Sequence, residues 1–213
     1  MIRIFSDSTC DLSKELIERY DITILPLHIL LGEEEFLDGV DITPDEIYKW
    51  SDEHKTTPKT SAVSIEDVMK AAGPYLDQGD EIISFSISDD MSTSGNVMHM
   101  AAAELEAEDR FHVINSANLS TGIGLLVIEA AIMAKEGKTS EEIITKIGAE
   151  AAGAGKLCGR YINLSLSWRP LQRTGCVGRR CFEAASADYC CRRSNEACKE
   201  ISWKYASCHI GLC

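Results

Sequence analysis

The strongest constraint on the fold is a repeated alternation of short apolar runs with longer segments of helical periodicity. Residues 1–5, 81–86 and 111–114 have the composition of β-strands, and residues 22–31 form a further β-like run with a proline that indicates an edge or a bend. The predicted helices cover residues 12–20, 44–50, 64–72, 93–105, 119–135 and 139–149. Strands joined through helices form parallel sheets, so we predict an α/β protein with a mainly parallel sheet and flanking helices.

Segments rich in hydroxyl groups follow the predicted strands directly. They are residues 6–11 (SDSTCD), 86–94 (SISDDMSTS) and 115–121 (NSANLST). Because ligands of parallel α/β sheets bind beyond the carboxyl ends of the strands, we expect these three segments to meet at a binding site. The polar loop at residues 56–64 (TTPKTSAVS) is a fourth segment that can join them.

The stretch at residues 84–99, SFSISDDMSTSGNVMH, passes from a strand to a helix through small polar residues. A helix start of this kind presents unpaired backbone N–H groups and the positive end of the helix dipole, which together attract anions. Ser92 or Thr93 is either a plain helix cap or a ligand of such an anion, and the two roles are compatible. Asp89 and Asp90 would repel an anion, so we expect both to point to solvent.

Composition divides the chain of 213 residues near position 155. Residues 1–155 contain 11 Lys and Arg against 30 Asp and Glu, a net charge of −19, whereas residues 156–213 contain 10 against 4, a net charge of +6. We therefore expect an N-terminal domain at 1–155 and a distinct tail at 156–213. The acidic domain lacks the basic surface that nucleic acids need. With no apolar run long enough to span a bilayer, we expect a cytoplasmic protein without stable membrane insertion.

The tail contains eight of the nine cysteines and little periodicity. One interpretation of the tail is a divergent domain. A zinc site is disfavoured because the tail lacks paired C-x-x-C spacing. Disulfides are disfavoured because we expect a reducing compartment. A frameshift near residues 147–160 is a further hypothesis. Read one base later with synonymous codons, residues 161–174 can encode TSTLAYLGGRCSGL and residues 182–190 can encode LKLRPLIIV, which is the pattern of an apolar strand.

Four motifs in order give the chain a resemblance to a known family. They are SDSTCDL at 6–12, TSAVS at 60–64, ISDDMSTSGN at 87–96 and VINSANLSTGIGLLVIEAA at 113–131. Together they resemble the DegV family of bacterial fatty-acid-binding proteins over about residues 1–150. The shifted-frame strings resemble the segment that follows in that family. The resemblance implies two α/β domains with a fatty acid between them, of which the second would be truncated or aberrant here.

The resemblance also implies a site and a partner. A long-chain fatty acid would be the bound ligand, and its carboxylate would be held by the hydroxyls of Thr60 and Ser92. The supporting anion site would comprise Ser61, Thr93, Ser94, Gly95 and Asn96. Members of the family carry the acyl group for a separate ATP-dependent fatty acid kinase, so the chain itself would be a carrier without catalytic residues, metal or cofactor.

The residues alone allow two alternatives to a fatty acid carrier. Ser92 could act as the nucleophile of a hydrolase or a phosphoryl-transfer enzyme, but the sequence has no G-x-S-x-G elbow, and His99 lies seven residues further along the same predicted helix. No P-loop or G-x-G-x-x-G motif supports nucleotide binding. A truncated domain that folds and binds nothing is the third interpretation.

Overall fold

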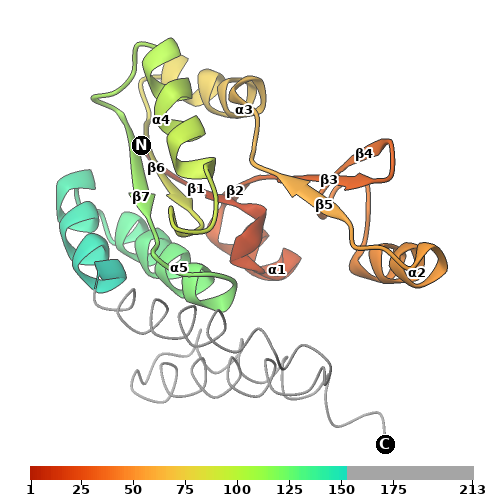
Figure 1. Ribbon diagram of the computed structural model, residues 1–213. Coiled ribbons are helices and arrows are strands. Elements are labelled where there is room, and N and C mark those ends of the chain that lie inside the picture. The colour runs from red at the N-terminus through yellow and green to blue at the C-terminus, as the bar shows by residue number, and fades with distance from the viewer. Residues whose placement is uncertain (153–213) are drawn as a thin grey trace, which may run out of the picture. The chain divides into compact units, whose positions relative to one another are not determined.

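The computed structural model describes residues 1–152, so the predicted tail at 156–213 lies outside the described residues. Four strands form a parallel sheet in the order β2-β1-β6-β7 (Figure 1). Their bounds are β1 (Ile2–Asp7), β2 (Ile22–Leu25), β6 (Glu81–Ser86) and β7 (Phe111–Asn115). The predicted fold class is thus confirmed, with β1 and β6 at the centre of the sheet.

Helices cover both faces of this sheet. One face packs against α3 (Ile65–Asp77) and α4 (Ser94–Glu104), and the other against α1 (Lys14–Tyr20), α5 (Thr121–Lys135) and a last helix at residues 140–152. Side chains alternate along the strands: Ile4 faces the α5 side and Phe5 the α3 and α4 side. All six predicted helices are present, with their ends shifted by a few residues.

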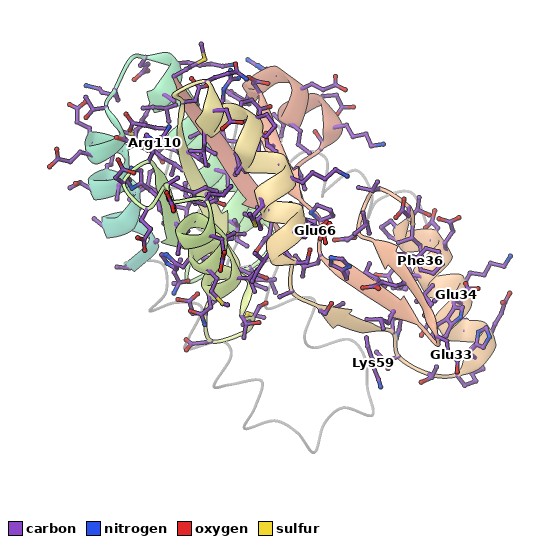
Figure 2. The ribbon with its side chains drawn as sticks, turned by 90° about the horizontal axis from the view of Figure 1, so that it is seen from above. Glu33, Glu34, Phe36, Lys59, Glu66 and Arg110 are labelled. Carbon is purple, nitrogen blue, oxygen red and sulfur yellow. The ribbon has the colours of Figure 1, made fainter. Side chains whose placement is uncertain are left out.

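A second sheet is smaller and antiparallel, in the order β4-β3-β5. It consists of β3 (His28–Leu31), β4 (Glu34–Leu37) and β5 (Lys59–Ser61), and α2 (Pro44–His54) lies between β4 and β5 in the chain. Figure 2 shows this small sheet and α2 to one side of the large sheet. Its own apolar cluster consists of Ile29, Leu31 and Ile42 with Phe36, Ile47 and Trp50.

The sequence predicts this region only in part. The β-like run at 22–31 bends at Pro26, as expected, and its two halves are strands in different sheets, because Pro26 has no N–H to continue a ladder. The acidic stretch at 32–41 has the composition of a loop but contains β4, which pairs with the apolar strand β3. The polar loop at 56–64 likewise contains β5, whose exposed side chains give no apolar alternation to reveal a strand.

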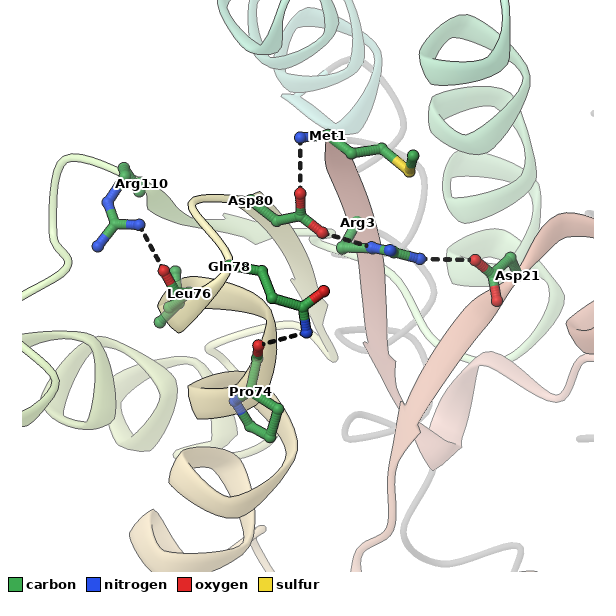
Figure 3. A network of polar contacts seen from close by, with 8 residues as sticks. All are labelled: Met1, Arg3, Asp21, Pro74, Leu76, Gln78, Asp80 and Arg110. Atoms are coloured by element: carbon green, nitrogen blue, oxygen red, sulfur yellow. Dashed lines mark hydrogen bonds and ion pairs between the residues drawn. The ribbon is translucent and has the colours of Figure 1, made fainter.

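The amino ends of β1 and β6 are joined by a polar network (Figure 3). The amino group of Met1 donates to Asp80 Oδ1 at 2.7 Å, and Arg3 Nε donates to Asp80 Oδ2 at 2.9 Å. The same guanidinium reaches Asp21 Oδ2 at 2.9 Å and lies over the ring of Tyr75. This network therefore fixes the amino ends of the two central strands, at the end of the sheet opposite the predicted site.

Candidate anion-binding site

Hydrogen bonds join the loops that follow β1, β6 and β7 at the carboxyl end of the large sheet. Asp7, at the end of β1, accepts the N–H of Ile87 through Oδ2 at 2.8 Å. Ser88 donates its N–H to the carbonyl of Asn118, in the loop after β7, at 3.1 Å. The expectation that these three polar segments meet is confirmed.

The sequence around Asp7 indicates a turn or a helix cap, but in the structure its side chain joins two strands. Its side chain is fully buried, and Thr9 Oγ1 donates to Asp7 Oδ1 at 2.5 Å. Burial raises the pKa of Asp7, and the hydrogen bonds from Thr9 and Ile87 offset this only in part. Asp7 therefore links the ends of two neighbouring strands.

The loop between β6 and α4 folds around Ser88. The carbonyl of Ser88 accepts the N–H of Met91 at 2.8 Å and the N–H of Ser92 at 3.2 Å. Ser92 Oγ accepts the N–H of Ser94 at 3.2 Å and lies 3.0 Å from Ser94 Oγ. Ser92 thus lies one residue before the N-cap Thr93, and its half-buried hydroxyl accepts the first N–H of α4.

The first turn of α4 retains free donors. Within residues 1–152, the main-chain N–H groups of Thr93, Gly95 and Asn96 have no hydrogen-bond acceptor. Such unsatisfied amides at the positive end of a helix dipole are suited to an anion. The predicted supporting residues from Thr93 to Asn96 therefore lie together at one helix terminus, directly after Ser92.

Ser86 is a candidate site residue that the sequence did not single out. It is the last residue of β6, is fully buried, and its hydroxyl has no hydrogen-bond partner in the described part of the chain. Ser84, two residues earlier, contacts the sulfur of Met98 in α4 at 3.3 Å, and strand alternation places Ser86 on the same face. That alternation was the signal available in the sequence.

Gly95 allows the close approach of α4 to this edge. A Cβ atom at Gly95 would lie 2.7 Å from Asp89 Oδ1 and 3.0 Å from Ser86 Oγ. Asp89 and Asp90 are both exposed, as expected, but the carboxylate of Asp89 also lies beside the first turn of α4. Gly95 has no side chain and leaves room for this carboxylate, and loop composition gave no indication of the contact.

Thr60 and Ser61 lie in β5 of the small sheet, with exposed side chains. Thr60 pairs with Ile29 and Ser61 pairs with His28 in the register of β3 and β5. The ring of His28 is bound on both sides: its Nδ1 lies 2.8 Å from Glu35 Oε1 and its Nε2 lies 2.9 Å from Asp67 Oδ2, at the start of α3. This contact joins the small sheet that carries Thr60 to the helices of the large sheet.

The surroundings of Ser92 do not resemble those of a nucleophile. In the part of the chain described, its hydroxyl contacts Ser94 alone, and His99 is exposed on α4. Nucleophilic catalysis needs a base within hydrogen-bond reach. Over the same residues no group of three or more His, Cys, Asp or Glu side chains is placed to hold a metal ion, and no helix is both long and apolar enough to cross a membrane.

The fold defines a class: an α/β protein in which the loops after three parallel strands and the start of α4 meet at the carboxyl end of the sheet. Residues 1–152 match the family described as "Uncharacterised protein, DegV family". The chain therefore belongs to the DegV family, as its motif order predicts.

Relatives and solved structures agree with this assignment. A DegV domain-containing protein of Clostridium perfringens is 39% identical over 146 residues, which are 68% of this chain and 52% of that protein. The crystal structure of a stearic-acid-binding protein from Eubacterium ventriosum is 35% identical, with a TM-score of 0.65 over 69% of this chain and 52% of that one. A DegV family protein from Thermus thermophilus, whose structure was described for its fatty acid binding, is 28% identical, with a TM-score of 0.66 over 71% and 53%. The chain thus spans about half the length of the relatives it matches.

Proposed function

We propose that this chain binds a long-chain fatty acid whose carboxylate is held at the first turn of α4. The observation that carries the proposal is the set of free amides of Thr93, Gly95 and Asn96 beside the Ser92 hydroxyl, in a family whose solved members bind fatty acids. In this proposal Ser92 and Thr60 donate their hydroxyl protons to the carboxylate oxygens. Ser61 and Ser94 belong to the supporting polar surface.

The energetics favour a long acyl chain over a small acid. Each hydrogen bond to a charged group contributes roughly 1.5–3 kcal/mol, and each buried methylene contributes about 0.8 kcal/mol. The head group therefore sets the orientation and the acyl chain sets most of the affinity. In relatives about twice as long, a further half of the protein is available to contact that chain.

The role that follows is that of an acyl carrier for a separate ATP-dependent fatty acid kinase. In that reaction a carboxylate oxygen attacks the γ-phosphorus of ATP, and acyl phosphate and ADP are formed. The reacting groups belong to the fatty acid, ATP and the kinase, so the carrier needs only to bind the acid and present its carboxylate. Asp89 and Thr93, at the carboxyl end of the large sheet, are exposed to solvent. A carboxylate bound there would be accessible to the kinase.

Native mass spectrometry of the protein produced in bacteria tests lipid binding. We expect a co-purifying long-chain fatty acid, and we expect Thr60→Ala and Ser92→Ala to weaken retention about tenfold each, which corresponds to about 1.4 kcal/mol. Thr145→Ala, an exposed hydroxyl in the helix at 140–152, is the matched control. Equal retention in all three variants would remove these hydroxyls from the site.

We also propose that the tail at 156–213 derives from a shift of reading frame, which the change in charge and cysteine content near residue 155 supports. The coding DNA across residues 145–165 tests this directly against related reading frames. A chain with the tail restored to the other frame is then the comparison for lipid retention. If neither form carries a fatty acid, the lipid-binding proposal is abandoned.

A further inference from the structure

The carboxylate of Asp89 lies at the helix terminus that the proposed ligand would use. Its Oδ1 is 2.7 Å from the position of a Cβ atom on Gly95, the second residue of α4. The main-chain N–H of Asp89 is held by Asn115 Oδ1 at 3.3 Å, whereas its carboxylate has no hydrogen bond or ion pair within residues 1–152. The backbone of Asp89 is therefore fixed, while its exposed side chain is free to turn.

A second group faces the same point from inside the protein. Ser86 Oγ lies 3.0 Å from that Cβ position, and it is a fully buried hydroxyl without a partner among the described residues. A buried hydroxyl normally has a hydrogen-bond partner. Together with the free amides of Thr93, Gly95 and Asn96, it marks the start of α4 as a site that is only partly satisfied in this state.

Two carboxylates cannot share this terminus without cost. The positive end of one helix dipole favours a single nearby anion, and a second negative charge within a few ångströms is repelled. A ligand carboxylate at the α4 amides therefore either displaces the side chain of Asp89 or binds against its charge.

We propose that Asp89 is an affinity-determining residue, because its carboxylate lies beside the first turn of α4 and repels a ligand carboxylate bound at the α4 amides. The inference rests on the proposed fatty acid site. Repulsion by Asp89 lowers the affinity for every carboxylic acid by a similar factor. At a given concentration of acid, only those whose acyl chain contributes enough binding free energy then remain bound.

Asp90 is the matched control, since it is the neighbouring exposed acid in the same loop and contributes none of the three atoms nearest to a Cβ on Gly95. Dissociation constants of stearate and octanoate are measured for the 213-residue chain and for its Asp89→Asn, Asp89→Glu and Asp90→Asn variants, after removal of co-purified lipid. We expect Asp89→Asn to bind both acids at least fivefold more tightly. Asp89→Glu, which retains the charge, and Asp90→Asn should stay within twofold of the parent chain.

A second measurement tests whether the charge of Asp89 acts on α4 itself. If the Asp89 carboxylate interacts with the positive end of the α4 dipole, Asp89→Asn lowers the melting temperature of the lipid-free protein, whereas Asp90→Asn does not. Unchanged or weaker stearate binding by Asp89→Asn overturns the role of Asp89 and leaves the fatty acid site standing. Absence of stearate binding in the parent chain overturns the fatty acid site, and the role of Asp89 with it.

Discussion

Asp7 and Ile87 are 80 residues apart in sequence, yet the Asp7 carboxylate accepts the Ile87 N–H at 2.8 Å. The bond links the carboxyl ends of β1 and β6, and Ile87 is the first residue of the loop that carries Ser92. A buried carboxylate thus fixes the point from which the candidate site begins.

Replacing Asp7 with alanine leaves the buried N–H of Ile87 without an acceptor. We expect Asp7→Ala to lower the free energy of unfolding by about 1–3 kcal/mol, measured by urea denaturation at pH 7. Asp7→Asn should lower it less, because the amide oxygen can accept from Ile87 and the amide nitrogen can donate to Thr9 Oγ1. Equal losses in the two variants would contradict the assignment of this contact.

Titration of Asp7 has a defined direction. Because burial raises its pKa in the folded state, the folded protein binds the proton more tightly than the unfolded chain does. Asp7 therefore adds stability as the pH falls through this raised pKa, and the gain is complete below the ordinary value of 3.8. The stability of the parent chain relative to Asp7→Asn should increase from pH 7 to pH 4 in urea titrations, and a decrease would contradict the role of burial.

Gly95 should resist substitution for steric reasons. In Gly95→Ala the new methyl group meets Asp89 Oδ1 and Ser86 Oγ, and Ser86 lies in the buried strand β6 and has little room to move. We expect a loss of about 1–3 kcal/mol from overpacking, reduced by the gain in helix propensity. Gly73→Ala in α3 is the control, because a Cβ there meets nothing within 4 Å. It should be neutral or stabilising by up to about 1 kcal/mol.

The parallel sheet and the position of the site follow from local patterns in the sequence. Apolar runs followed by helices specify β1, β6 and β7, and polar residues after them specify the end of the sheet where the candidate site lies. The small sheet could not be predicted in this way, because β4 and β5 are short and polar and exist through pairing with β3. The position of Asp7 likewise depends on its contact with Ile87, which is distant in sequence. The position of Asp89 depends on its approach to Gly95 across a tight turn.

The start of α3 provides a pH-dependent contact between the two sheets. The carboxylate of Asp67 accepts hydrogen bonds from Ser64 and His28. Burial alone would raise the pKa of Asp67, but the hydrogen bonds from Ser64 and His28 and the charge of His28 lower it overall. Asp67 therefore contributes stability above its ordinary pKa, and this is lost as the pH falls through the lowered value.

The Ser64 cap and the Asp67 carboxylate should differ in their effects. Ser64→Ala should cost about 1 kcal/mol as the loss of a helix cap, whereas Asp67→Ala should cost more because it also removes a partner of His28. Guanidinium unfolding at pH 7 and pH 3 measures both variants. The difference between Asp67→Ala and the parent chain should shrink at pH 3. A constant difference would show that the charge of Asp67 is unimportant.

The network around Asp80 separates stability from binding, because it lies at the amino ends of β1 and β6. Hydrogen bonds from the amino group of Met1 and from Arg3 lower the pKa of Asp80. Asp80→Asn removes a charge that both cations share, and we expect a loss of about 1–3 kcal/mol near pH 7. Because the folded pKa is lowered, the stabilisation is present above the ordinary value of 3.8 and disappears as the pH falls through the lowered pKa.

Calorimetric melting from pH 7 to pH 2 should therefore show the melting temperatures of Asp80→Asn and the parent chain converging, while stearate retention by Asp80→Asn at 10 °C stays unchanged. Loss of stearate in this variant would show that the two ends of the sheet are coupled, and would remove Asp80→Asn as a stability control for the site variants.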